Sequence, residues 1–234
     1  MPTSNPERLV PGRGRLLRMA ALRFGAGLIA LLLLIFLPAG TTRYWQAWVY
    51  LATLFVPMCL ELVYLLRHDP ALLERRMRGK EREREQGVLI RLGSLCYVLV
   101  YVLAGLDRRF AWSEIPAAMV LAADLVILAG YALFARVLKV NSYASRVVAV
   151  EPGQRVVSTG PYAVVRHPMY VAILAMFQAA PVALGSWWAL LPALPLWAII
   201  GARARQEEQV LLRELPDYAA YVRRTRYRLI PGVW

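Results

Sequence analysis

The sequence predicts an all-α integral membrane protein, because its composition and the lengths of its apolar stretches both depart from those of soluble domains. Hydrophobic residues make up 59% of the 234 residues and charged residues only 18%. Four stretches approach or exceed the roughly 20 apolar residues that a transmembrane helix needs: 23–38, 44–66, 88–106 and 115–138. After these four helices we expect a proline-broken helical hairpin over 169–200 and then a cytoplasmic C-terminal helical region.

The first expected span, 23–38, is the shortest, with Arg23 able to snorkel at its edge. A cleaved signal peptide is the alternative, because basic residues precede an apolar core of about signal length. No A-x-A-like cleavage site follows, and further spans do follow. An uncleaved first helix is therefore favoured.

The hairpin is expected from a run of 169–200 that is too long for one helix and is interrupted by prolines and a glycine. Two arms of about 16 residues would each reach roughly 24 Å, slightly less than the ~30 Å hydrocarbon core. We therefore expect each arm to lean on other helices.

Charge is distributed very unevenly along the chain. The formal net charge is +13, which would also suit nucleic-acid binding. In the expected topology, however, only Arg43, Arg108 and Arg109 of the 28 Lys and Arg residues fall on one side of the membrane. This is the positive-inside pattern, so we expect both termini in the cytoplasm, a lipid bilayer as the partner, and no nucleic acid.

Two polar segments connect the spans. Residues 67–87 alternate acidic and basic side chains after a proline and predict a solvated cytoplasmic helix, with a lid or an anionic-lipid contact as the alternative. Residues 141–161 are polar and rich in turn residues. No internal repeat divides the chain, so we expect a single membrane domain over 1–234.

Several common kinds of site are excluded by the residues present. The chain has no G-x-G-x-x-G after a strand, no G-x-x-x-x-G-K-[ST], no H-E-x-x-H and no G-x-S-x-G. Cys59 and Cys96 lie in expected spans, and the histidines are His68 and His167. No metal site is expected from these spacings.

A group of cations, aromatics and carboxylates flanks the expected hairpin. Because a hairpin returns to the side where it started, the two flanks should meet in one polar pocket under the hydrocarbon helices. The residues are Tyr162, Arg166, His167 and Tyr170 before the hairpin, and Glu207, Glu208, Tyr218, Tyr221 and Arg228 after it. Glu207 shares the apolar face of its helix with Leu211 and Leu215, so its carboxylate is expected to have a cationic or hydroxyl partner.

Two sequence blocks flank the hairpin, "TGPYAVVRHPMY" before it and "EEQVLLRELPDYAAYVRRTRYRLIPG" after it. From about Asn141 to the C-terminus, the chain resembles the isoprenylcysteine carboxyl methyltransferase family and the broader group of phospholipid methyltransferases. The resemblance implies a methyltransferase with S-adenosylmethionine as cofactor and a lipophilic methyl acceptor that enters from the bilayer. It makes 141–234 the cofactor-binding catalytic region and 1–140 the N-terminal spans.

The resemblance also implies roles for individual residues. Arg166, Glu207, Glu208 and Arg228 would be catalytic. Cofactor-binding residues would be Gly160, Pro161, Tyr162, Arg166, His167, Tyr170, Glu207, Glu208, Tyr218 and Tyr221. "ELPDY" replaces the family's commoner phenylalanine-glycine turn, so the geometry of that turn is an open question.

Each of these residues also has a structural interpretation. Arg166 can snorkel or set topology, Tyr162 and Tyr170 can be interfacial aromatics, and the glutamates can pair with arginines one helical turn before them. Asp124, near the middle of a span, can mark a substrate path or be a buried structural acid, and Glu61 is expected to be solvated at the edge of its span.

Several functions remain open. The acceptor can be a prenylated cysteine carboxylate, with carboxyl methylation favoured, or a phospholipid amine or a small thiol. A membrane reductase of related architecture that uses NADPH and a non-catalytic membrane binding protein are the other two hypotheses.

Overall fold

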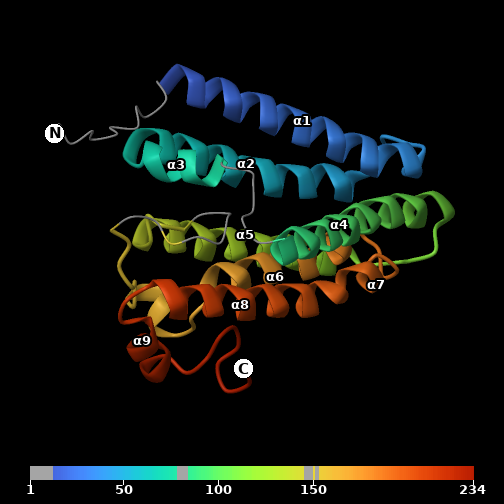
Figure 1. The fold of residues 1–234 in the computed structure, drawn as a ribbon. Coiled ribbons are helices and arrows are strands. Elements are labelled where there is room, and N and C mark those ends of the chain that lie inside the picture. The colour runs from blue at the N-terminus through green and yellow to red at the C-terminus, as the bar shows by residue number, and fades with distance from the viewer. Residues whose placement is uncertain (1–12, 78–83, 145–149, 151–152) are drawn as a thin grey trace.

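The structure, a computed structural model, describes residues 13–77, 84–144, 150 and 153–234. Every regular element in these residues is helical, which confirms the predicted all-α class (Figure 1). The elements are α1 (Arg13–Ala39), α2 (Trp45–His68), α3 (Pro70–Met77), α4 (Arg84–Phe110), α5 (Ala117–Val140), the 3-10 helix η1 (Gly160–Ala163), α6 (Pro168–Ala183), α7 (Leu190–Ala193), α8 (Pro195–Glu214) and α9 (Tyr218–Arg224).

Four helices, α1, α2, α4 and α5, are long and apolar enough to cross a membrane, which confirms the four predicted spans. They have 27, 24, 27 and 24 residues. At 1.5 Å per residue, each reaches at least roughly 36 Å, more than the ~30 Å of a hydrocarbon core. Apolar side chains on their outer faces are exposed, including Leu22, Leu60, Leu95 and Leu125. This is the surface that a bilayer covers.

The first helix differs from its prediction. It begins at Arg13, so Arg23 lies well inside α1 and is not at the edge of a span. Arginine is a good helix former, and the helix therefore continues through it where a hydropathy window stops. The Arg23 Nη1 donates a hydrogen bond of 2.6 Å to the carbonyl oxygen of Met77, the last residue of α3. Arg23 thus joins α1 to α3.

The hairpin is present, but its second arm is longer than expected. The first arm, α6, has 16 residues, whereas α8 runs for 20 residues without a break from the hairpin into the predicted amphipathic segment. Pro195 is the first residue of α8, where a missing N–H leaves no helical hydrogen bond unmade. The side chains of Glu207 and Glu208 are therefore fixed to the same rigid helix that forms the hairpin.

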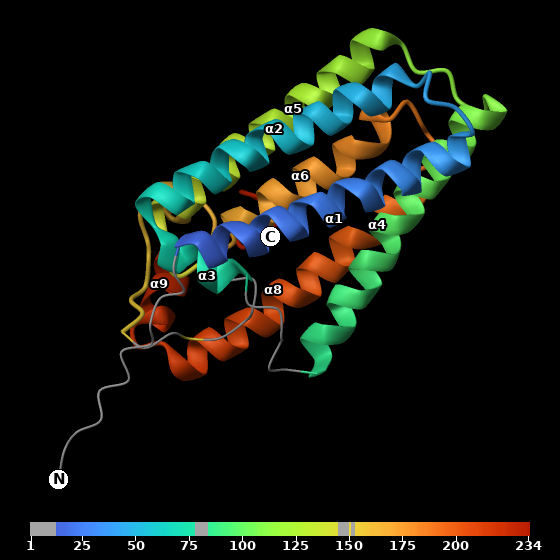
Figure 2. The ribbon, with the colours of Figure 1, turned by 90° about the horizontal axis from the view of Figure 1, so that it is seen from above.

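The long helices α1, α2, α4, α5, α6 and α8 run along roughly the same axis (Figure 2), and their contacts close into a ring. Around this ring α1 packs on α4, α4 on α8, α8 on α6, α6 on α5, and α5 on α2. Two glycines allow the closest approaches. A Cβ at Gly105 would lie 2.6 Å from the carbonyl oxygen of Ile35 in α1, and one at Gly130 would lie 2.6 Å from Met176 in α6.

The two ends of the ring differ in packing. At the end that holds the α1–α2 and α4–α5 turns, an apolar cluster that includes Ile35, Tyr101 and Ala183 fills the centre. Near the other end, where α9 and the C-terminal residues lie, the helices enclose a cavity. Of the predicted helix over 67–87, α3 is present, and 78–83 lies outside the described residues.

Candidate functional site

Arg166 and His167 lie in a short non-helical stretch between η1 and α6. Gly160 opens this region with a φ of +59°, a left-handed value that glycine adopts without strain, and Pro168 begins α6. The backbone N–H of Arg166 donates to the Tyr227 carbonyl at 2.9 Å, and that of His167 donates to the Arg228 carbonyl at 3.0 Å. The helix breaks on both sides therefore leave two peptide N–H groups to hold the C-terminal segment.

Glu208 on α8 is the centre of a buried charge cluster. Its carboxylate accepts hydrogen bonds from Arg166 Nε at 2.6 Å, from His167 Nε2 at 3.2 Å and from Arg228 Nε at 2.7 Å. Burial alone would raise the pKa of Glu208, but these hydrogen bonds outweigh it and lower the pKa to about 2. The group is therefore ionised at any pH near neutrality.

Arg166 has further partners besides Glu208. Its Nη1 donates to the carbonyl oxygens of Thr225 and Arg226, at 2.8 and 2.6 Å. The side chain is buried, with 7% of its surface exposed. Three of its five N–H bonds thus hold the segment after α9 against α8. The interpretation of Arg166 as a snorkelling residue does not fit these contacts.

Glu207 points to a different set of partners. Its Oε2 accepts a hydrogen bond of 2.6 Å from the Tyr170 hydroxyl, which itself accepts one of 3.1 Å from Arg203 Nε. His167 Nδ1 lies 3.8 Å from the same carboxylate oxygen. Glu207 therefore has the hydroxyl and cationic neighbours expected for a carboxylate on an apolar helix face. Leu211 and Leu215 lie on the cavity wall with Glu207.

Three tyrosines close the site on the side of α9. The Tyr221 hydroxyl donates to the Tyr162 carbonyl at 2.8 Å, and Asn141 Nδ2 donates to the Tyr162 hydroxyl at 2.8 Å. Burial raises the pKa of Tyr162 to about 12, and burial also raises the pKa of Tyr218 and of Tyr221 above the ordinary range. All three hydroxyls therefore keep their protons and can act as hydrogen-bond donors near neutral pH.

The structure shows how "ELPDY" forms the turn between α8 and α9 without the commoner phenylalanine-glycine pair. Asp217 adopts a left-handed φ of +65° and precedes α9 directly. Aspartate is one of the few residues with a side chain that tolerate this conformation. The turn is therefore made without the glycine of the commoner pattern.

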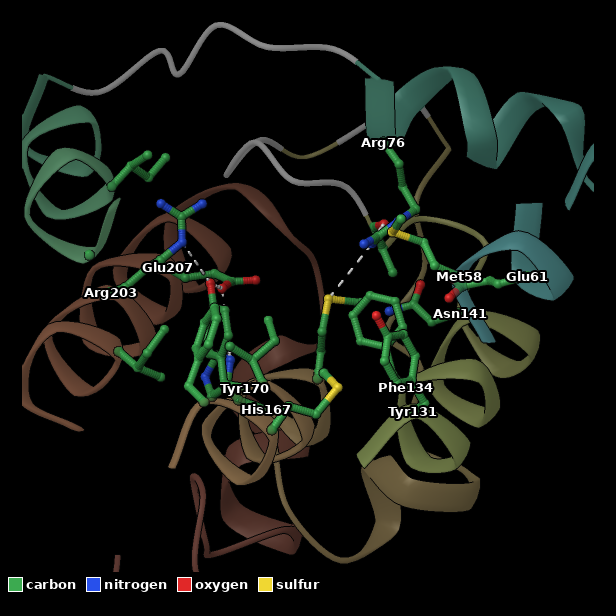
Figure 3. Close-up of a pocket in the computed structure, with 18 of the residues that line it drawn as sticks. Met58, Glu61, Arg76, Tyr131, Phe134, Asn141, His167, Tyr170, Arg203 and Glu207 are labelled. Carbon is green, nitrogen blue, oxygen red and sulfur yellow. Dashed lines mark hydrogen bonds and ion pairs between the residues drawn. The ribbon is translucent and has the colours of Figure 1, made fainter. Parts of the chain in front are cut away.

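A cavity of about 960 Å³ joins these groups to the interior of the helix ring, as Figure 3 shows in part. It is close to the upper end of the roughly 300–1,000 Å³ typical of ligand pockets. Seven of the predicted residues line it: Tyr162, Arg166, His167, Tyr170, Glu207, Tyr218 and Tyr221. Apolar residues from deep within the spans, among them Leu31 of α1 and Ile127 of α5, line it as well.

Four predicted site residues do not line the cavity. Glu208 and Arg228 are in the charge cluster behind its wall, and Gly160 and Pro161 form the turn that leads to it. Direct contact with a ligand in the cavity is thus open to Arg166, His167 and Glu207, while Glu208 and Arg228 hold the wall in place.

Sequence reasoning missed several polar residues of the wall. Arg203, 8% exposed, was considered only as a helical partner of Glu207, although it lies one turn before Glu207 on the same face of α8. Glu61 and Arg76 come from α2 and α3. Glu61 is not at a solvated edge as expected but on the cavity wall, a position that no local pattern encodes. Asp124 is buried, 4% exposed, and does not line the cavity.

Fold and site together define a multi-span helical membrane protein with an internal ligand cavity that is polar at one end and apolar at the other. Residues 120–213 match the model of the isoprenylcysteine carboxyl methyltransferase family, which confirms the family resemblance found in the sequence. The match begins within α5, earlier than Asn141, and ends before Tyr218, Tyr221 and Arg228. Members of that family are methyltransferases that use S-adenosylmethionine, so the match supports this class of enzyme. A comparison with curated proteins gave no match.

Proposed function

We propose that this protein is an S-adenosylmethionine-dependent methyltransferase that methylates the carboxyl group of a lipophilic, isoprenylcysteine-like acceptor. The observation that carries the proposal is the cavity, in which residues of the family-matched segment form the polar end while side chains at hydrocarbon depth form the other. A polar cofactor and a lipophilic acceptor can therefore meet inside one enclosure.

When bound, S-adenosylmethionine would supply a methyl group on a sulfonium: a carboxylate oxygen of the acceptor would attack the methyl carbon in line, the C–S bond would break, and the products would be a methyl ester and S-adenosylhomocysteine. This transfer needs no covalent enzyme intermediate, so the residues of the cavity need only orient the reactants and exclude water. Glu207, His167 and Tyr170 would bind the polar parts of the cofactor, and Tyr162, Tyr218 and Tyr221 would enclose it.

A carboxylate acceptor needs a cation that binds and orients it inside the cavity. Arg166 and Arg228 are held by Glu208, whereas the Arg203 side chain reaches the cavity beside Glu207 and Tyr170 (Figure 3). We assign Arg203 the role of orienting the acceptor carboxylate. Its bond to the Tyr170 hydroxyl fixes the direction of the guanidinium.

We further propose that the cavity opens toward the cytoplasm and that both termini lie there. Arg43 in the α1–α2 turn and Arg108 and Arg109 in the last turn of α4 lie at the opposite end of the helix ring, and the positive-inside rule favours few cations on the outer side. Helices from both halves of the chain line the cavity, which supports a single functional unit over 1–234.

Calorimetric titration of the purified protein with S-adenosylhomocysteine and with NADPH tests the proposal. Binding of S-adenosylhomocysteine with accompanying thermal stabilisation is the expected result. Glu207→Gln should weaken that binding, and Glu114→Gln, which changes an exposed acid in the α4–α5 turn, should not. Stabilisation by NADPH but not by S-adenosylhomocysteine would contradict the proposed methyltransferase and favour the reductase hypothesis.

A further inference from the structure

The apolar end of the cavity has a floor. On each of the six long helices, the residues that line the cavity stop before the end of the ring that holds the α1–α2 and α4–α5 turns. Beyond them the centre of the ring is filled by the apolar cluster that includes Ile35, Tyr101 and Ala183. The deepest lining residues are Leu34 of α1, Tyr50 of α2, Val98 of α4, Ile127 of α5, Phe177 of α6 and Leu196 of α8.

Aromatic side chains from three helices give this floor a fixed shape. Tyr50, Tyr97 and Phe177 line the cavity. The Tyr97 ring lies edge-to-face against the rings of Phe177 and Tyr101, with centroids 4.9 and 4.5 Å away. The hydroxyls of Tyr101 and Tyr50 are joined by a hydrogen bond of 2.6 Å. Rings that interlock in this way resist displacement by a ligand, because a packed interior has no free volume to receive them.

The wall between the polar end and this floor is apolar on α6 and α8. Tyr170 and Arg203 are the last polar lining residues on these two helices in the direction of the floor. The lining residues that follow are Ile173, Met176 and Phe177 on α6, and Ile200, Ile199 and Leu196 on α8. A hydrocarbon tail on an acceptor held at Arg203 is therefore sheltered from water along this wall.

Helix geometry sets the depth of the floor. Seven residues separate Tyr170 from Phe177 on α6 and Arg203 from Leu196 on α8, or roughly 10 Å at 1.5 Å per residue. Eleven residues separate the polar Glu61 from Tyr50 on α2, or roughly 16 Å. An extended backbone covers about 3.5 Å with three bonds, so the four chain bonds of an isoprene unit cover roughly 5 Å. The wall therefore accommodates two to three isoprene units, and four units exceed it.

We propose that the aromatic floor of Tyr50, Tyr97 and Phe177 limits the length of the acceptor's hydrocarbon tail to about three isoprene units. This inference rests on the proposed function and narrows its substrate class by tail length. The carboxylate of the acceptor is bound at Arg203, and the far end of its tail meets the floor. A tail with a fourth unit must fold back on itself or displace the rings, and either change weakens binding.

A series of ligands that differ in tail length alone tests the limit. S-geranyl-, S-farnesyl- and S-geranylgeranylcysteine share the cysteine head and carry two, three and four isoprene units. Their affinities are measured by calorimetry in one neutral detergent and corrected for partition into micelles without protein. The wild type should bind the three-unit ligand more tightly than the two-unit ligand, and the four-unit ligand more weakly than the three-unit ligand. Affinity that continues to rise at four units would overturn the inference.

Phe177→Ala opens the floor without leaving a hydroxyl unpaired. It should bind the four-unit ligand about tenfold more tightly than the wild type does, because the fourth unit can then leave water without folding back. Its affinity for the three-unit ligand should change by less than about threefold. For each ligand the ratio of variant to wild-type affinity is compared, since partition into micelles cancels in that ratio. Phe177→Leu, a smaller change, should move the same ratio in the same direction.

Phe55→Ala is the matched control. Phe55 lines the cavity on α2, five residues from Tyr50 toward the polar end, and is half-buried like Phe177. The variant removes the same ring from the wall above the floor, so the four-unit ligand should still bind more weakly than the three-unit ligand. A selective gain for four units in Phe55→Ala, or the absence of one in both Phe177 variants, would overturn the role of the floor.

Titration with S-adenosylhomocysteine separates this inference from the proposed function. The Phe177 and Phe55 variants should bind it as the wild type does, because neither residue belongs to the polar end, and this binding also shows that the variants are folded. If the wild type does not bind it, the proposed function fails, whereas a length limit removed by Phe177→Ala would still establish the floor for a lipophilic ligand. Equal ratios at all three lengths would overturn the floor and leave the methyltransferase standing.

Discussion

Two buried carboxylates at opposite ends of the helix ring are held in different ways. Glu208, 4% exposed, is held by three side chains that can carry positive charge, Arg166, His167 and Arg228. Asp107, 1% exposed, accepts hydrogen bonds from the Ser113 N–H at 2.7 Å, from the Ser113 hydroxyl at 2.6 Å and from the Ser186 hydroxyl. The first carboxylate meets cations and the second meets neutral donors.

The difference follows from what each carboxylate holds. Asp107 ties the α4–α5 turn to the turn after α6, next to the apolar cluster that includes Ala104, Ala183 and Leu184. Glu208 ties α8 to Arg166 before α6 and to Arg228 in the C-terminal segment, beside a large cavity. Both carboxylates accept charge-assisted hydrogen bonds, but at Glu208 the arginine donors are charged as well, which adds ion-pair attraction to the bonds that hold the cavity wall.

Removing a cation from the Glu208 cluster should have the largest effect. Arg166→Ala leaves a buried carboxylate short of its partner and releases the carbonyls of Thr225 and Arg226. We expect a loss of about 3–5 kcal/mol in the free energy of unfolding and no measurable binding of S-adenosylhomocysteine. Denaturant unfolding and calorimetry measure the two effects. Arg166→Lys keeps the charge but not the three directed bonds, and full rescue by it would contradict this role.

Asp107→Asn should lower stability by less, about 1–3 kcal/mol, because an amide cannot accept all of the hydrogen bonds that the carboxylate accepts. The affinity for S-adenosylhomocysteine should stay at the wild-type value, since Asp107 does not line the large cavity. Thermal unfolding and titration on the same preparation give both quantities. A weaker affinity would show that the two ends of the ring are coupled.

Glu207→Gln tests the neighbour of Glu208 that does face the cavity. We expect the affinity for S-adenosylhomocysteine to fall about tenfold, with the free energy of unfolding changed by less than ~0.5 kcal/mol. Glu208→Gln should instead lower the free energy of unfolding strongly, as the main effect of the substitution. If both variants lose stability equally, the distinction between a wall residue and a ligand residue is wrong.

A last effect appears only at acid pH. Since the pKa of Glu208 falls from 4.5 to about 2 on folding, its contribution to stability is complete above pH 4.5 and is lost as the pH falls through about 2. The stability difference between wild type and Glu208→Gln should therefore be constant from about pH 8 to 5 and shrink at lower pH. Thermal unfolding across this series measures it, and a change between pH 8 and 5 would require another titrating group.

The site was predictable where local sequence and chain reversal sufficed. The proline-bounded Arg166-His167 pair and the twin glutamates were expected to meet because a hairpin returns to its starting side, and the 2.6 Å bond between Arg166 and Glu208 shows that they do. The sequence did not predict which glutamate faces the cavity and which one binds the arginines. Adjacent residues on a helix differ by about 100° in direction, and only the packed neighbours decide which one faces the cavity.

By itself the sequence determined the membrane class, the four long spans, the hairpin and the family resemblance, because hydrophobic length, prolines and ordered motif blocks are properties of the chain read in one dimension. Only the tertiary structure decided where α1 begins, that α8 is continuous, and that Glu61 and Arg76 face Arg203 and Glu207 across one cavity. The physical reason is that these features depend on contacts between helices distant in sequence. Such contacts arise when the ring closes, and no local pattern specifies them.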